Sequence, residues 1–339
     1  MTRWSSRILI ISGGLMAVLA MGYSLFWYSV MSRVQDGIKR WAIEQRAHGW
    51  DVSLGKQNIS GFPFLITVSF DEPKLTSRNN KLRWALPNVK ASTRPWALGR
   101  VAITGPGVHV INLPNGKRSL QLNQAKLNVD FASGQFQKAA LYLGGIKLAF
   151  PDENELKAEF IKARVRSNVF KEENDNALGR GVRVQTEVRQ VVLPKAWRSP
   201  LGNKIPKISL DVMTIDDIPF RGGWTAALES WRDNGGTLEI KTFDIDWKPL
   251  SLRAEGTFSF DEMLQPQGAM TAQIDGIDPA TEALSAAGVI DARTAFAIKF
   301  ANRALTSGGK SVSLPLRIQK SRLYLGPVQV LKFRPLQWK

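Results

Sequence analysis

Hydrophobic residues crowd the start of the chain, where residues 8–31 contain no charged side chain. At about 1.5 Å per helical residue this run is about 36 Å long, which is enough to cross a hydrocarbon core of about 30 Å. Arg3 and Arg7 precede the run, and the aromatic residues 26–28 lie near its end, where such rings favour the lipid headgroup region. We therefore expect a transmembrane signal-anchor over residues 8–31, with residues 1–7 in the cytoplasm.

A cleaved secretory signal is the alternative interpretation of this segment. Arg3 and Arg7 would then be its basic region, residues 8–19 its apolar core, and Ala20 the end of its cleavage site. The apolar run continues to Met31, which favours a retained anchor. The body of the chain is exported under both interpretations. We expect a single-pass inner-membrane protein with its large domain in the periplasm, since long domains translocate even when basic residues follow the span.

A second helical pattern follows directly, over residues 32–49. Val34, Ile38 and Trp41 recur at helical spacing, and charged residues occupy the other positions. This juxtamembrane helix could lie on the bilayer surface or pack against the first strands. The pattern does not decide between these two arrangements.

From Asp51 onward the hydrophobic period changes to two, which is typical of strands with one buried face. Breaks rich in glycine, proline, asparagine and serine separate the strands, and few helices are available for parallel crossovers. The pattern predicts a mainly β fold with a few short helices, in which long curved antiparallel meander sheets follow the transmembrane helix. The apolar positions change parity between Ile240 and Phe243, which predicts a β-bulge. The clearest alternating stretches are residues 66–70, 127–131, 156–160, 208–212, 250–254, 270–274 and 312–318.

Helical signals are few in this part of the chain. Residues 225–233 resemble a short helix closed by Asn-Gly, and Asp278 resembles the N-cap of a helix ending near Ala287. Asp291 could cap another helix, but the apolar alternation that follows it favours a strand, so this stretch stays open. We expect a first β half over residues 50–170, a polar loop over residues 171–181, and a second β half with helical insertions over residues 182–339.

Short motifs spread over nearly the whole chain carry a resemblance to a known family. They include Gly49-Trp50, the segment Ser60-Gly61-Phe62-Pro63-Phe64, Leu86-Pro87-Asn88-Val89, Arg94-Pro95-Trp96, Asp246-Trp247 and Leu325-Gly326-Pro327. In these the chain resembles the bacterial domain-of-unknown-function 2125 family. The resemblance implies an envelope protein on an inner-membrane anchor, distantly similar to AsmA-like proteins, whose curved sheets are associated with lipid handling. It implies no catalytic residues.

A long sheet with one apolar face must cover that face with itself, with helices or with another molecule. If the sheet curls without closing, the face forms a groove suited to acyl chains, and the protein would bind or transfer lipid. An ordinary packed β core is the alternative, because alternation reports only that one face is buried. The candidate groove residues are Ile66, Val68, Phe70, Leu127, Val129, Phe131, Leu250 and Leu252.

The charge pattern adds a second candidate surface. The chain has a formal net charge of +17, and no acidic residue follows Asp291. For an exported, membrane-anchored protein the available polyanions are phospholipid or other anionic lipid headgroups, so we expect no nucleic-acid partner. A solvated strand face is the alternative explanation of the charge run. The candidate contacts with an anionic surface are Arg317, Lys320, Arg322, Lys332 and Arg334.

Motifs of catalysis are sparse. The two histidines, His48 and His109, lie far apart without a metal-ligand spacing, and the chain has no cysteine. Adjacent carboxylates such as Asp216 and Asp217 would point to opposite faces of a strand. We therefore expect a non-enzymatic protein without cofactor or metal. A structural or assembly factor of the envelope that acts through protein contacts is the alternative, and an enzyme using an unrecognised carboxylate is a further one.

Overall fold

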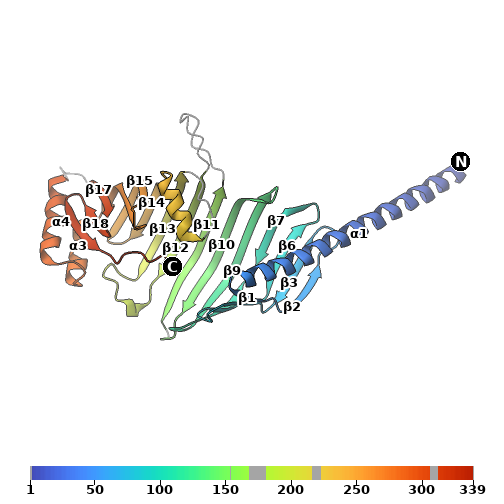
Figure 1. The fold of residues 1–339 in the computed structure, drawn as a ribbon, viewed down its shortest axis with the longest axis horizontal. Helices are drawn as coiled ribbons and strands as arrows, with labels where there is room; N and C mark the ends of the chain where they lie inside the picture. The colour runs from blue at the N-terminus through green and yellow to red at the C-terminus, as the bar shows by residue number, and fades with distance from the viewer. Residues whose placement is uncertain (1, 153, 168–180, 216–222, 306–311, 339) are drawn as a thin grey trace, which may run out of the picture. The chain divides into compact units, whose positions relative to one another are not determined.

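The computed structural model describes residues 2–152, 154–167, 181–215, 223–305 and 312–338. It confirms a mainly β protein with a long antiparallel meander behind an N-terminal apolar helix (Figure 1). The chain forms two compact units, residues 1–119 and 120–339, which we call the N-terminal unit and the C-terminal unit. The expected polar loop over residues 171–181 lies outside the described residues except for Gly181.

One uninterrupted helix, α1 (Thr2–Ala47), contains both the apolar run and the amphipathic pattern that follows it. It includes a segment long and apolar enough to cross a membrane. No proline or helix-ending glycine interrupts the helix before His48 and Gly49, and Gly49 takes up a positive φ of 87°. The membrane-spanning pattern and the body are therefore joined by continuous helix rather than by a linker.

The N-terminal unit pairs its strands antiparallel, and several pairs join strands that are not consecutive in the chain. The pairs are β1–β4, β4–β5, β5–β8, β2–β3, β3–β6 and β6–β7. The strands are β1 (Trp50–Ser53), β2 (Lys56–Ser60), β3 (Ile66–Asp71), β4 (Lys74–Ser77), β5 (Arg83–Ala85), β6 (Val89–Arg94), β7 (Ala97–Thr104) and β8 (Gly107–Leu113). The division between the units falls within β9 (Gly116–Ala132).

In the C-terminal unit each strand from β10 to β17 pairs with the next, as a meander requires. A register shift between Ile240 and Phe243 confirms the predicted bulge. The strands are β10 (Gln135–Ala149), β11 (Glu155–Ser167), β12 (Val182–Val192), β13 (Lys204–Ile215), β14 (Thr237–Trp247), β15 (Leu250–Phe260), β16 (Pro266–Asp275), β17 (Val312–Gln319), β18 (Arg322–Leu325) and β19 (Val328–Lys332). A 3-10 turn, η1 (Lys195–Trp197), follows β12.

Three short helices belong to this unit: α2 (Trp224–Asp233), α3 (Ile277–Ala286) and α4 (Ala292–Leu305). The expected N-cap of α3 was wrong by two residues. Gly276, in the left-handed region, precedes the helix, while the carboxylate of Asp278 accepts a hydrogen bond from Asn302 at 3.0 Å. The stretch after Asp291 is a helix rather than a strand, because Asp291 Oδ1 accepts the backbone N–H of Thr294 at 2.6 Å and caps it.

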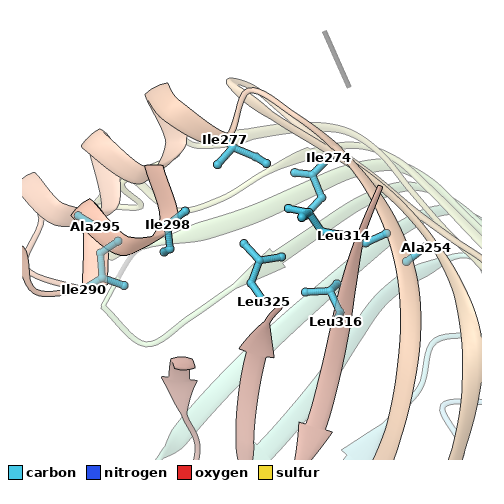
Figure 2. Packing of buried hydrophobic residues seen from close by; sticks show 10 residues of the cluster. Ala254, Ile274, Ile277, Ile290, Ala295, Ile298, Leu314, Leu316 and Leu325 are labelled. Atoms are coloured by element: carbon cyan, nitrogen blue, oxygen red, sulfur yellow. The ribbon is translucent and has the colours of Figure 1, made fainter. Parts of the chain in front are cut away.

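Helices α3 and α4 cover the apolar face of β15, β16 and β17. Figure 2 shows Ile277, Ala295 and Ile298 turned toward Leu314 and its neighbours on the strands. Helix α2 is held by Trp231, which is buried and donates its Nε1 hydrogen to the carbonyl of Ile215 at 3.0 Å. The described helices of the C-terminal unit therefore provide a cover for part of its sheet.

Candidate functional site

Helix α1 packs directly on the sheet of the N-terminal unit. Trp27 and Val30 are each 4% exposed and contact Ile66 of β3, with Ile59 of β2 beside them. The indole Nε1 of Trp27 also donates a hydrogen bond to the carbonyl of Leu65 at 3.1 Å. Val34 packs against the same cluster, so the packing alternative holds at the start of the juxtamembrane pattern, and the packing begins within the uncharged run.

An apolar pocket lies in the N-terminal unit between α1 and the strands. Its volume is about 530 Å³, within the range of about 300 to 1,000 Å³ typical of small-molecule sites. Val34, Ile38 and Trp41 line it from one face of α1, as their helical spacing requires. The strands β1, β3, β4, β6 and β7 and the segments next to them supply most of the rest of the lining. In Figure 1 helix α1 lies along β1, β2 and β3.

The lining of this pocket is almost free of polar side chains. Only Lys74, Ser92 and Thr93 interrupt a surface of aliphatic and aromatic residues. A buried water needs about two to four hydrogen-bonding partners, which such a surface does not supply. The pocket is therefore suited to an apolar occupant.

Three of the residues that the sequence proposed for a groove meet in this pocket. Ile66, Val68 and Phe70 are the buried positions of β3, and all three line the pocket. Ala91 of β6, which is the cross-strand neighbour of Val68, lines the pocket as well. Alternation along one strand thus identified one wall of the pocket.

The other proposed groove residues lie in the C-terminal unit. Leu127 and Val129 are half-buried in β9, and Phe131 is exposed with its ring 6.2 Å from that of Phe136. The structure places Leu250 and Leu252 against the cluster under α3 and α4, so their apolar face is packed by protein. None of these five lines the pocket of the N-terminal unit.

A row of side chains that is apolar except at one position crosses the sheet of the C-terminal unit. Cross-strand pairing joins Leu141, Ala163, Thr186, Leu210 and Phe243, all of which are half-buried. The same row continues into β15, β16 and β17, where α3 and α4 cover it and its residues are buried. The cover over this face is therefore more complete at β15–β17 than at β10–β14.

The basic candidates are all exposed, and three of them share a face. Arg317 pairs with Tyr324, and its guanidinium lies 4.9 Å from the centre of that ring. Arg322 pairs with Lys332 on the same side of the sheet. This face is turned away from α3 and α4, since the buried residues of β17 alternate with Arg317. Lys320 lies in the β17–β18 turn and Arg334 follows β19.

Two exposed aromatic features are not among the residues that the sequence predicted for a site. On α4, the rings of Phe296 and Phe300 stack 6.3 Å apart and project away from the core. Between β2 and β3, Phe62 and Phe64 are exposed next to α1. A helical interpretation of residues 292–305 would have found the first feature, because Phe296 and Phe300 are four residues apart.

Charged groups on the outer face of the C-terminal unit hold one another in ionised form. Hydrogen bonds from Arg183 lower the pKa of Asp211, with Gln185 adding to the effect and burial opposing it. Burial acts to raise the pKa of Asp244, but hydrogen bonds from Arg253 and Lys207 outweigh it, and the pKa lies below its usual value. These carboxylates are ion-paired at 2.6 to 3.3 Å rather than poised for proton transfer.

The two histidines lie in different segments of the N-terminal unit. His48 lies at the end of α1, and His109 is buried in β8, where desolvation lowers its pKa. Within the part of the chain that the structure describes, no three His, Asp and Glu side chains are grouped to hold a metal ion.

The fold and the pocket define a class: a β-meander protein with an N-terminal apolar helix docked over an apolar pocket. The chain belongs to the family of uncharacterized proteins conserved in bacteria (DUF2125), whose family model matches residues 27–334. The match begins at Trp27, the residue at which α1 starts to pack on β3. Comparison with curated proteins and with solved structures finds no match.

Replacing Trp27 by alanine should loosen α1 from the sheet. Truncating a buried tryptophan costs about 3 to 5 kcal/mol, so amide hydrogen exchange in β3 should accelerate by a factor on the order of 100 or more in the full-length protein. Leu25→Ala is the matched control, because Leu25 is exposed on the same helix. Equal exchange in the two variants would contradict the packing role of Trp27.

Proposed function

We propose that this protein is a membrane-anchored, non-enzymatic envelope protein that binds an acyl chain of a lipid in the pocket between α1 and the sheet. The observation that carries the proposal is the apolar pocket of about 530 Å³ directly beneath the apolar helix. The ion-paired outer carboxylates support the non-enzymatic part of the proposal.

The chemistry of the lining favours a hydrocarbon chain over a polar metabolite. Each methylene removed from water gains about 0.8 kcal/mol, whereas a polar group without a partner would lose free energy. A bilayer interior is as apolar as the pocket, so moving a chain between them has little net cost. An acyl chain would therefore exchange between the bilayer and the pocket rather than stay trapped in the pocket.

The position of the pocket along α1 also supports a lipid. Val34, the first lining residue of α1, is three positions beyond the uncharged run, or about 5 Å along the helix. Trp41, at the other end of the helical lining, is partly exposed. An acyl chain leaving the bilayer beside α1 would have to travel only a short distance.

A larger side chain in the wall of the pocket should exclude the acyl chain. Ala91→Leu adds apolar volume to the wall formed by β6 and should lower the amount of lipid that copurifies with the full-length protein. Ala102→Leu is the matched control, since Ala102 lies in the neighbouring strand β7 and is not among the lining residues. Mass spectrometry of lipid per mole of protein makes the comparison. The same lipid content in both variants would contradict binding in this pocket.

We further propose that α1 crosses the inner membrane and that the body lies in the periplasm. The apolar helix and the basic residues before it support this orientation, although Arg33, Lys39 and Arg40 after the span weaken the charge asymmetry. Alkaline phosphatase fused after Lys339 should be active and should sediment with membranes. Activity of only a cytoplasmic reporter would reverse the orientation, and a soluble product beginning near Met21 would indicate cleavage.

We also propose that the face carrying Arg317, Arg322 and Lys332 contacts an anionic lipid surface. Each basic residue near such a surface contributes about 1 kcal/mol, and salt screens this contribution. When the protein is held in nanodiscs of neutral lipid, free phosphatidylglycerol vesicles should bind to it. Replacing the three residues by glutamine should weaken this binding by about 3 kcal/mol, or on the order of 100-fold. If neutral vesicles bind as well as phosphatidylglycerol vesicles, the basic face is a solvated surface and the proposed contact is wrong.

A further inference from the structure

The loop between β2 and β3 presents apolar side chains that the packing of the unit leaves largely exposed. Phe62 is 52% exposed, Phe64 is 68% exposed and Leu65 is 42% exposed. The surrounding residues 57–70 contain no charged side chain. Three neighbouring exposed apolar side chains in an uncharged loop are costly in water.

The same loop is attached to α1 inside the uncharged run. The hydroxyl of Tyr23 donates a hydrogen bond to the carbonyl of Pro63 at 2.6 Å, and Trp27 donates to the carbonyl of Leu65. The ring of Phe62 lies 5.5 Å from that of Trp27, edge to face, and 6.5 Å from that of Tyr23. The loop therefore lies at the level of Tyr23 to Trp27 on the helix.

That level falls inside the hydrocarbon if α1 spans from Ile8. Tyr23 lies about 22 Å along the helix from Ile8, and Trp27 about 28 Å. Both distances are shorter than the hydrocarbon thickness of about 30 Å. The contacts of the loop with these two residues thus bring it within about 8 Å of the non-cytoplasmic boundary, on the lipid side.

Part of the loop backbone has the internal partners that such a position requires. A polar backbone group in hydrocarbon must find its partner within the protein. The carbonyl of Gly61 accepts the N–H of Leu65 at 2.8 Å, Tyr23 and Trp27 satisfy the carbonyls of Pro63 and Leu65, and Pro63 has no N–H to satisfy.

We propose that the loop of residues 61–65 is embedded in the non-cytoplasmic leaflet of the bilayer that α1 crosses, with Phe64 and Leu65 facing lipid. The inference rests on the anchoring of α1 proposed above, and it does not require a lipid in the pocket. The proposal also adds to the proposed lipid binding, because Ile66, the residue that follows the loop, lines the pocket. The loop would hold the membrane-facing side of the pocket at the level of the acyl chains.

Spin labels can measure the depth of the loop, because the natural chain has no cysteine to replace. Full-length Phe64→Cys, labelled with a nitroxide in proteoliposomes, should collide readily with oxygen and poorly with a water-soluble nickel complex. Leu15→Cys, exposed on the apolar run, is the lipid reference, and Asn79→Cys, exposed in the β4–β5 turn, is the water reference. Leu65→Cys gives a second label in the loop.

Loop labels that match the lipid reference would support the proposal. Loop labels that match the water reference, while Leu15→Cys reports lipid, would overturn it and leave the anchor in place. If the Leu15→Cys label also reports water, the anchoring fails and the loop proposal fails with it. Occupation of the pocket is measured separately by the lipid content of Ala91→Leu, so the two proposals can fail independently.

Discussion

The packing of α1 on β3 positions both the apolar pocket and the loop between β2 and β3. Trp27 and Val30 belong to the apolar run by sequence, but their side chains are buried against Ile66. Because α1 continues without a linker into the packed segment, the proposed anchor would hold the first strands close to the bilayer. The pocket exists because the same helix continues over the sheet with Val34 to Trp41 facing it.

A sheet with an apolar face needs a cover, and the two units obtain it differently. In the C-terminal unit, α3 and α4 seal the face at β15–β17 with buried aliphatic contacts. In the N-terminal unit, α1 covers the face incompletely and leaves an apolar volume between helix and strands. Close packing is the norm in protein interiors, so this volume is the feature of the fold that most needs a functional explanation.

Much of the fold was predictable from local patterns, and the site only in part. The seven clearest alternating stretches are strands, and the bulge after Ile240 is present, because both follow from the two-residue period. The alternation after Asp291 misled, since that stretch is helix α4. Alternation also identified Ile66, Val68 and Phe70, but it could not separate a pocket wall from a packed core such as that of Leu252. That difference depends on which helix lies over the strand, which is a long-range property. The contacts of Phe62 with α1 were hidden for the same reason.

The most direct test of whether lipid binds in the pocket is site-specific photo-crosslinking within the N-terminal unit. A photoreactive residue at Val68 faces the pocket, and one at Thr67 points to the other face of β3, because Thr67 alternates with the buried Ile66 and Val68 and is not among the lining residues. If lipid occupies the pocket, irradiation of the full-length protein in its native membrane should give a lipid adduct from Val68 and none from Thr67. Adducts from Val68 only to α1 or to other strands of the same chain would contradict it and would identify the pocket as packed core.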